Sequence, residues 1–334
     1  MQTWQLKSQF CEAEAVDEAG MLTKCVFIIG DGKHFTPFAP AAWVGHLGAD
    51  TNLPPYLRQL AAEFVCVPFG IGAYERSSAA TEWSQIPVDL YAHPEHGFTS
   101  SGVWTLLEHD AHSLTMRIDF PAEHDVSHVE RTLTLDPDYP AIDFILTLYT
   151  RRETQQPVAL HPMFRLPDAP ADLAIKAEFA LGFTDPGSTP KGAEAIIPFQ
   201  EFHDLAAIPL VDGGHSDYTM LPHVKPIEAM IFLTGARGPF EISYLKEAAR
   251  VRMTWDHNIL PNCMMWASDR SFAPELGLPP IRCVALEPIV AAFGLAPKIS
   301  QAENPLTTRG IPTVLTLTPD QPTVIHYRIE ASAF

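Results

Sequence analysis

Leu114-Thr-Met-Arg-Ile-Asp-Phe120 alternates apolar and polar side chains without a break. Because successive side chains of a β-strand point to opposite faces of a sheet, this period of two predicts a half-buried strand. Val251-Arg-Met-Thr-Trp-Asp256 has the same pattern. Strands with one apolar and one polar face indicate sheets that pack together over a core.

Outward from these stretches, short apolar segments recur at a spacing of about ten residues. Turn signals separate them, because the chain has 31 prolines and 19 glycines, and helical periodicity is rare. We therefore predict an all-β fold, a large antiparallel β-sandwich. Further strands are predicted at Lys24–Ile29, Phe64–Val67, Val103–Glu108, Val129–Leu135, Ile142–Tyr149, Ile227–Leu233, Phe240–Tyr244, Ile281–Leu286, Thr313–Leu317 and Val324–Ile329.

Only one or two short helices are expected. The clearer one is predicted at Pro55–Glu63, which begins with a proline pair and has an apolar face. A second is predicted at Ile289–Phe293, before Gly294. No internal repeat or polar linker divides the chain, so we expect one domain over residues 1–334, with a division of the sandwich near residue 170 left open.

Arg131 is a charged residue inside a predicted strand. It has the same parity as Val129, Leu133 and Leu135. This parity leaves open whether its side chain points into the core or into a cleft.

The composition is that of a soluble globular protein, with 46% hydrophobic residues and a mean hydropathy of +0.02. Forty acidic residues against 22 basic ones give a net charge of −18, which disfavours binding to nucleic acid and to anionic membranes. No apolar run approaches the length of a membrane span, and the N-terminus lacks the features of a signal peptide. We therefore expect a cytoplasmic protein that binds a small, uncharged molecule.

The cysteines and histidines do not indicate a metal site. The five cysteines are widely spaced inside apolar runs, which is typical of buried, reduced thiols. His93-Pro-Glu-His96, His109-Asp-Ala-His112 and His124-Asp-Val-Ser-His128 have the spacing of ligands on a helix, but none lies in a predicted helix. No phosphate-binding glycine loop or dinucleotide fingerprint is present. We therefore expect no metal and no cofactor.

One histidine follows directly on an apolar strand, in Gln156-Pro-Val-Ala-Leu-His-Pro-Met-Phe-Arg-Leu-Pro167. Because Pro162 has no N–H for a strand ladder, we expect the strand to stop at His161. Glu287 precedes Pro288 in the same way and is flanked by Ala285, Leu286 and Ile289. A carboxylate with apolar neighbours on both sides is rarely there for solubility alone.

His161-Pro-Met-Phe-Arg-Leu resembles the His-Pro-Tyr-Phe-Asn-Leu stretch of the aldose 1-epimerases, or galactose mutarotases, where the histidine is the catalytic acid. Other segments agree in the same order along the chain. Glu63-Phe-Val-Cys-Val-Pro-Phe-Gly70 and His96-Gly-Phe98 resemble motifs of the glucose-6-phosphate 1-epimerase branch. Asn262-Cys-Met-Met-Trp-Ala-Ser-Asp269 and Arg282-Cys-Val-Ala-Leu-Glu-Pro288 correspond to the Trp-containing strand and to the segment of the catalytic glutamate.

The resemblance implies a galactose mutarotase-like sandwich and roles for individual residues. Glu287 would be the catalytic base and His161 the catalytic acid. The substrate would be bound by His96, Trp266 and Asp217, although the motif around Asp217 is shifted by one residue against the family pattern. Phosphate recognition is in doubt, because Thr99, Ser100 and Ser101 stand where the phosphate-using branch has an arginine, and Arg76 is a substitute cation.

The expected function is that of an aldose 1-epimerase-like isomerase, which interconverts the α and β anomers of a hexose or related sugar. Alternatives are a non-catalytic carbohydrate-binding protein on the same fold and a hexose-6-phosphate 1-epimerase. A glycosidase or lyase would need a second buried acid, for which Asp217 is the candidate. The sequence leaves open which sugar is bound and what the oligomeric state is.

Overall fold

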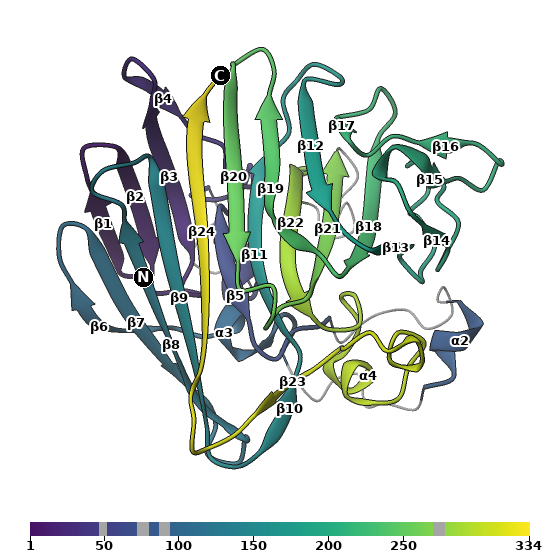
Figure 1. Cartoon of the computed structure of the whole chain (residues 1–334). Coiled ribbons are helices and arrows are strands. Elements are labelled where there is room, and N and C mark those ends of the chain that lie inside the picture. The colour runs from purple at the N-terminus through teal and green to yellow at the C-terminus, as the bar shows by residue number, and fades with distance from the viewer. Residues whose placement is uncertain (47–51, 72–79, 87–93, 270–277) are drawn as a thin grey trace.

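The computed structural model describes residues 1–46, 52–71, 80–86, 94–269 and 278–334. Within these residues the chain forms one eleven-stranded and one nine-stranded sheet, all of whose paired strands are antiparallel. Figure 1 shows the nine-stranded sheet in front of the other. The predicted all-β sandwich is confirmed.

The strand order of the eleven-stranded sheet is β1 (Thr3–Lys7), β2 (Cys11–Val16), β3 (Leu22–Ile29), β5 (Glu63–Cys66), β11 (Val158–Arg165), β22 (Arg282–Val290), β21 (Asn262–Asp269), β18 (Ile227–Thr234), β13 (Leu181–Thr184) and β14 (Glu201–Phe202), with β4 (Lys33–Phe35) beside β3. The order of the nine-stranded sheet is β17 (Met220–Leu221), β12 (Leu173–Glu178), β19 (Arg237–Tyr244), β20 (Ala249–Trp255), β24 (Thr323–Ala333), β9 (Ala141–Thr150), β8 (Val126–Leu135), β7 (Ser113–Asp119) and β6 (Thr105–His109).

Shorter elements complete the described part of the chain. Two strand pairs lie outside the large sheets, β10 (Thr154–Gln156) with β23 (Leu315–Leu317) and β15 (Ile208–Pro209) with β16 (His215–Ser216). The α-helices are α1 (Pro55–Arg58), α2 (Thr81–Ser84), α3 (Gly97–Ser101) and α4 (Pro297–Gln301), and two short 3-10 helices lie at Leu205–Ala207 and Thr307–Arg309. Among the described helices, none has the length and apolar character needed to span a membrane.

Every strand predicted from alternation and apolar runs overlaps a strand of the structure, but both helix predictions need correction. The helix at Pro55 ends at Arg58, and Glu63, the last residue of the predicted helix, is instead the first residue of β5, which is buried along its whole length. The helix predicted at Ile289–Phe293 is wrong. Strand β22 continues to Val290, with Ile289 and Val290 buried in clusters on opposite faces of the sheet.

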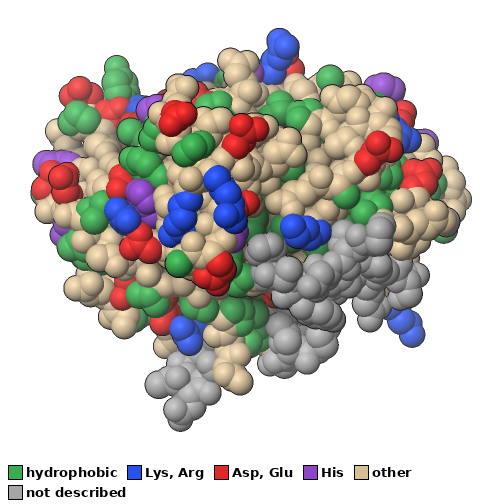
Figure 2. All heavy atoms as spheres, turned by 90° about the horizontal axis from the view of Figure 1, so that it is seen from below, with side chains coloured by type: hydrophobic (Ala, Val, Ile, Leu, Met, Phe, Trp, Pro, Cys, Tyr) green, Lys and Arg blue, Asp and Glu red, His purple; other side chains and the backbone are tan. Residues whose placement is uncertain are grey.

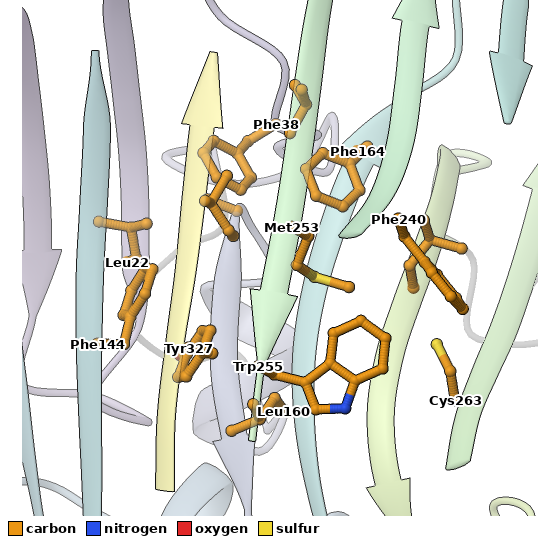
Figure 3. Packing of buried hydrophobic residues seen from close by; sticks show 14 of the residues in the cluster. Leu22, Phe38, Phe144, Leu160, Phe164, Phe240, Met253, Trp255, Cys263 and Tyr327 are labelled. Carbon is orange, nitrogen blue, oxygen red and sulfur yellow. The ribbon is translucent and has the colours of Figure 1, made fainter. Parts of the chain in front are cut away.

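A large apolar core fills the space between the two sheets (Figure 3). Leu160 and Phe164 of β11 meet Met253 and Trp255 of β20 and Tyr327 of β24 there. A second apolar cluster covers the other face of the eleven-stranded sheet. The central strands of this sheet are thus buried on both faces, which explains why they read as continuous apolar runs.

The second cluster contains the odd-numbered residues Ala159 and Met163 of β11, whereas their even-numbered neighbours face the core between the sheets. Strand β22 divides in the same way, with Cys283, Ala285 and Ile289 in the second cluster. By this parity, His161 and Glu287 belong to the face away from the nine-stranded sheet.

Arg131 points into the core between the sheets. It is buried, donates to the carboxylate of Glu63 on β5, and donates through Nη1 to the carbonyl of Gly20 at 2.5 Å. Tyr327 of β24 also donates to Glu63. The ion pair therefore joins the two sheets.

The distribution of charged side chains and the state of the cysteines can be compared with what the composition indicates. Figure 2 shows acidic and basic side chains interspersed on the lower face of the molecule, despite the net charge of −18. All five cysteines are buried with free thiols, as expected.

Candidate active site

His161 and Glu287 lie opposite each other on neighbouring strands. The β11–β22 register pairs Ala159 with Ile289 and Met163 with Ala285, so the residues midway between these pairs, His161 and Glu287, face one another. Their outer neighbours are fixed in the same way, because His161 pairs with Phe64 of β5 and Glu287 with Met264 of β21. Directly opposed residues on one face have Cβ atoms about 5 Å apart.

The expectation that a strand stops at His161 is wrong, and so is the expectation that Glu287 ends one. Both residues lie inside strands, followed by Pro162 and Pro288. Met163 donates its N–H to the carbonyl of Ala62, on the β5 side. Because successive N–H groups of a strand point to opposite sides, a residue with an N–H at position 162 would direct it toward β22. Pro162 is tolerated because, in the described register, β11 and β22 have no paired positions between the two flanking pairs.

The two side chains form a close, buried pair. Nε2 of His161 lies 3.5 Å from Oε1 of Glu287, and the side chains are 5% and 0% exposed. The imidazole stacks on Phe64 with ring centroids 4.4 Å apart and an interplanar angle of 19°. Within the described residues, neither carboxylate oxygen of Glu287 has a hydrogen-bond partner. The carboxyl group therefore keeps its capacity to accept a hydrogen bond from a ligand in the cavity that it lines.

Burial acts in opposite directions on the pKa values of the pair. It raises the pKa of the Glu287 carboxyl well above its usual range. Burial, and then the neighbouring His96, lowers the pKa of His161 well below its usual range. Both shifts arise because a low-dielectric surrounding disfavours the charged form of each group.

These side chains open into a cavity of about 400 Å³ on the outer face of the eleven-stranded sheet. The size suits a small molecule such as a monosaccharide. The lining residues are Tyr56, Leu57, Leu60, Phe64, Phe69, Ile71, Glu95, His96, His161, Glu228, Met230, Met264, Trp266, Glu287 and Gly294.

His96 reaches this cavity through two interlocked turns. Its N–H donates to the carbonyl of Gly70 at 2.9 Å, and the N–H of Phe98 donates to Val67 at 2.9 Å. Gly97 has a φ of +86°, and a Cβ there would lie 2.3 Å from the carbonyl oxygen of Val67. The turns of the Pro-Phe-Gly and His-Gly-Phe motifs therefore pack directly against each other's backbone, and this contact requires glycine at position 97.

The His96 ring is enclosed by other rings. Its centroid lies 4.8 Å from that of Tyr56, 5.7 Å from that of Phe69 and 5.6 Å from that of His161. Burial lowers the pKa of His96 to about 4. The ring is therefore neutral at neutral pH and can bind a hydroxyl as a neutral donor or acceptor.

Thr99, Ser100 and Ser101 make internal hydrogen bonds. Thr99 Oγ1 donates to the Val65 carbonyl at 2.7 Å and accepts from the Val67 N–H. Ser100 and Ser101 donate to the carbonyl of Glu95 at 3.2 and 3.1 Å. These residues therefore hold the turn in place.

Asp217 does not join the other predicted residues, which corrects the expectation that it shares their cavity. It is exposed, beyond β16, and it is absent from the described lining of the cavity. Its Oδ1 accepts the N–H of Thr219 at 2.8 Å, and it also accepts the Thr219 hydroxyl. The shifted motif thus forms a local turn. Arg76 lies outside the described residues.

Two cavity carboxylates were missed in the sequence. Glu228 lines the cavity and accepts Nε1–H of Trp266 and Oγ–H of Ser268, both at 2.6 Å. The sequence did contain an indication of this position. Glu228 alternates with Met230 and Phe232 in a predicted strand, so its side chain lies on the same face as these two residues, which belong to or pack against the second apolar cluster. The second is Glu95, which directly precedes the His-Gly-Phe motif and whose Oε2 accepts the hydroxyl hydrogen of Tyr56 at 2.8 Å.

Trp266 presents its ring to the cavity, with its centroid 6.2 Å from that of His161. Its indole N–H is already engaged by Glu228. An aromatic ring fixed in this way offers an apolar face beside the His161–Glu287 pair.

The solved structures named below are similar to this chain in fold but distant in sequence. No protein-family model matches the chain, and no curated protein sequence does. A candidate aldose 1-epimerase from Escherichia coli K12 is 15% identical, with 100% of this chain and 99% of that chain covered and a TM-score of 0.65. An aldose epimerase homologue from C. elegans is 11% identical, with 99% of each chain covered and a TM-score of 0.63.

A galactose mutarotase-like protein from Lactobacillus casei is 13% identical, with 99% of this chain and 100% of that chain covered and a TM-score of 0.58. At such identities the likeness concerns the arrangement of the strands over the whole chain. The chain therefore has the galactose mutarotase-like fold.

Proposed function

We propose that the protein is an aldose 1-epimerase-like isomerase, which interconverts the α and β anomers of an uncharged hexose or related sugar. The observation that carries this proposal is the opposed His161–Glu287 pair, 3.5 Å apart and buried at a cavity of monosaccharide size. The fold likeness supports it only at the level of architecture.

Anomer exchange requires one proton to leave the anomeric hydroxyl while another reaches the ring oxygen. In the proposal Glu287 takes the first proton and His161 gives the second, so that the ring opens without a free alkoxide or oxonium ion. After rotation about the bond to the carbonyl carbon, the reverse transfers close the ring on the other face. No net proton is gained or lost.

The opposite pKa shifts suit this chemistry. Burial raises the pKa of Glu287 and lowers that of His161, so it favours the uncharged form of the pair, with the shared proton on the carboxyl. In the proposal the transfer starts from the other form, with the proton on the imidazole. The proton can reside on either group, and the two forms differ by the transfer that the reaction needs. A low-dielectric cavity also keeps bulk water from competing for it.

The remaining lining suits an uncharged sugar. His96 and Glu228 offer polar atoms for hydroxyl groups, and Trp266 offers an aromatic face for the apolar side of a pyranose ring. Among the described lining residues there is no lysine or arginine to bind a phosphate. We therefore propose a free sugar as the substrate. We also propose a cytoplasmic site of action, on the sequence composition alone.

The first test is anomer exchange by NMR over a panel of aldoses, with wild type and with Glu287→Gln. The amide keeps the size of the side chain but cannot act as a base, so exchange should slow about 10²- to 10⁴-fold. Affinity, measured by calorimetry, should change little. Replacement of His161 by Asn should act likewise, and the double variant should lose little more than the worse single one, because both groups serve one step.

The matched control is Glu108→Gln, at an exposed position of β6, an edge strand of the nine-stranded sheet, and outside the described cavity lining. It should exchange anomers at the wild-type rate. If wild type accelerates exchange of no aldose while still binding one, the protein is a carbohydrate-binding protein on this fold. An unchanged rate in Glu287→Gln would remove the base assignment.

A further inference from the structure

Glu95 and Tyr56 form a second polar pair in the cavity, beside His96. Both line the cavity, and the Tyr56 hydroxyl donates to Glu95 Oε2 at 2.8 Å. The Tyr56 side chain is 7% exposed, and its ring packs against Phe64 with centroids 6.2 Å apart. The role proposed above for His161 and Glu287 does not use this pair.

The backbone of Glu95 is also held. Its carbonyl accepts hydrogen bonds from the hydroxyls of both Ser100 and Ser101. The next residue, His96, has a φ of +56° and is tied through its N–H to Gly70. Main chain and side chain are thus fixed before any ligand arrives, which is how a binding residue minimises the cost of ordering.

The donor from Tyr56 occupies one oxygen of the carboxylate and leaves the group with further acceptor capacity. An ionised carboxylate has about four lone-pair sites and accepts hydroxyl hydrogens strongly. Sugar hydroxyls are such donors. A deoxy position offers none and would leave a desolvated acceptor unpaired, which penalises the deoxy sugar.

We propose that Glu95, oriented by Tyr56, is a specificity-determining residue that accepts hydrogen bonds from one or two hydroxyl groups of the sugar. The proposal rests on the function proposed above and adds a substrate class, namely sugars that carry a hydroxyl at the position facing Glu95. It also gives the serines after His-Gly-Phe a purpose, since they anchor the Glu95 carbonyl.

The test compares an aldohexose with its monodeoxy derivatives, in wild type, Glu95→Gln and the exposed control Glu108→Gln. Wild type should lose about tenfold or more in kcat/KM for at least one derivative, because a charged hydrogen bond is lost. Glu95→Gln should lower kcat/KM for the parent sugar by a similar factor, chiefly through KM, and should leave that derivative nearly unaffected. The control should match wild type.

Tyr56→Phe provides a second variant that retains the ring packing. It should weaken the discrimination against the same derivative by about threefold or more. Equal losses for every sugar in Glu95→Gln, or unchanged discrimination in both variants, would overturn the proposal. If no sugar undergoes accelerated exchange, the epimerase function fails, yet the same comparison made by calorimetric affinity still decides the role of Glu95.

Discussion

Glu287 is a fully buried carboxyl group, and within the described residues neither of its oxygens has a hydrogen-bond partner. Such a residue costs stability that a structural side chain at the same position would not cost. The cost depends on pH. Its pKa in the folded chain is raised above the unfolded value, so the folded state binds the proton more tightly.

The sign of this effect gives a prediction. The stability that the protonated carboxyl contributes is fully present below its unfolded pKa, about 4.3, and is lost as pH rises through the folded value. Glu287→Gln has no such loss. We expect the variant to match wild type near pH 4 in free energy of unfolding and to exceed it increasingly as the pH rises toward the folded pKa, by up to about 1.4 kcal/mol for each pH unit, with no further gain above that pKa.

Denaturant unfolding at several pH values, with Glu108→Gln as the control, measures this difference. A gap between Glu287→Gln and wild type that stays constant from pH 4 to pH 8 would contradict the raised pKa. In Glu287→Gln the rate of anomer exchange should fall while the free energy of unfolding rises, because a buried ionisable group that serves function costs stability.

At this scale the sequence was informative about His161, Glu287 and His96, because each stands in a motif with a proline or glycine beside it. Asp217 was misplaced because a short polar motif does not show which way a turn faces. Glu228 was overlooked because its signal, parity with Met230 and Phe232, has meaning only when both faces of a strand are known to be buried.

At the level of secondary structure, the packing of two turns positions His96. The Val67–Gly97 contact joins two turns that are 30 residues apart in sequence, and Gly97 has no space for a side chain there. We expect Gly97→Ala to destabilise the protein by about 2–4 kcal/mol, since a strained φ and a backbone clash add up. His96 should also move, lowering the rate of anomer exchange.

Gly32→Ala is the matched control for this prediction. Gly32 has a φ of +89°, close to that of Gly97, but an added Cβ would meet nothing within 4 Å. It should therefore cost only the backbone strain, about 1 kcal/mol. Equal midpoints for the two variants in denaturant would show that the packing of the turns is not what requires glycine.

The strands themselves were largely predictable where one face is polar, as at Leu114–Asp119 in β7. They were harder to delimit in the eleven-stranded sheet. Ile289 was assigned to a helix because β22 is apolar on both faces, and a run without alternation does not distinguish a buried strand from a short helix. The prolines at 162 and 288 made the strand ends harder to predict as well. The gap in the pairing of β11 and β22 that accommodates Pro162 arises only when the two strands come together in the fold.

Across the whole molecule, the two sheets are joined in the apolar core by the ion pair of Arg131 and Glu63, both fully buried. Removing one partner leaves a buried charge without compensation. We expect Arg131→Met to cost about 3–5 kcal/mol in free energy of unfolding. The double variant Arg131→Met, Glu63→Gln should recover a large part of this loss, since it removes both charges.

Guanidinium-induced unfolding of the single and double variants measures the coupling. Additive losses would mean that the two residues contribute separately and that the pair is not the link between the sheets. The sequence left the direction of Arg131 open because the partner, Glu63, lies 68 positions away on the other sheet.

The register that opposes His161 to Glu287 also limits how the gene can vary. Insertion or deletion of a single codon inside β11 or β22 would rotate the rest of that strand by one position, so that either the imidazole or the carboxyl would turn into the apolar core between the sheets. Length changes can therefore accumulate in the connecting segments but not within Val158–Arg165 or Arg282–Val290. Selection therefore acts on the number of residues in these two strands as well as on their identity.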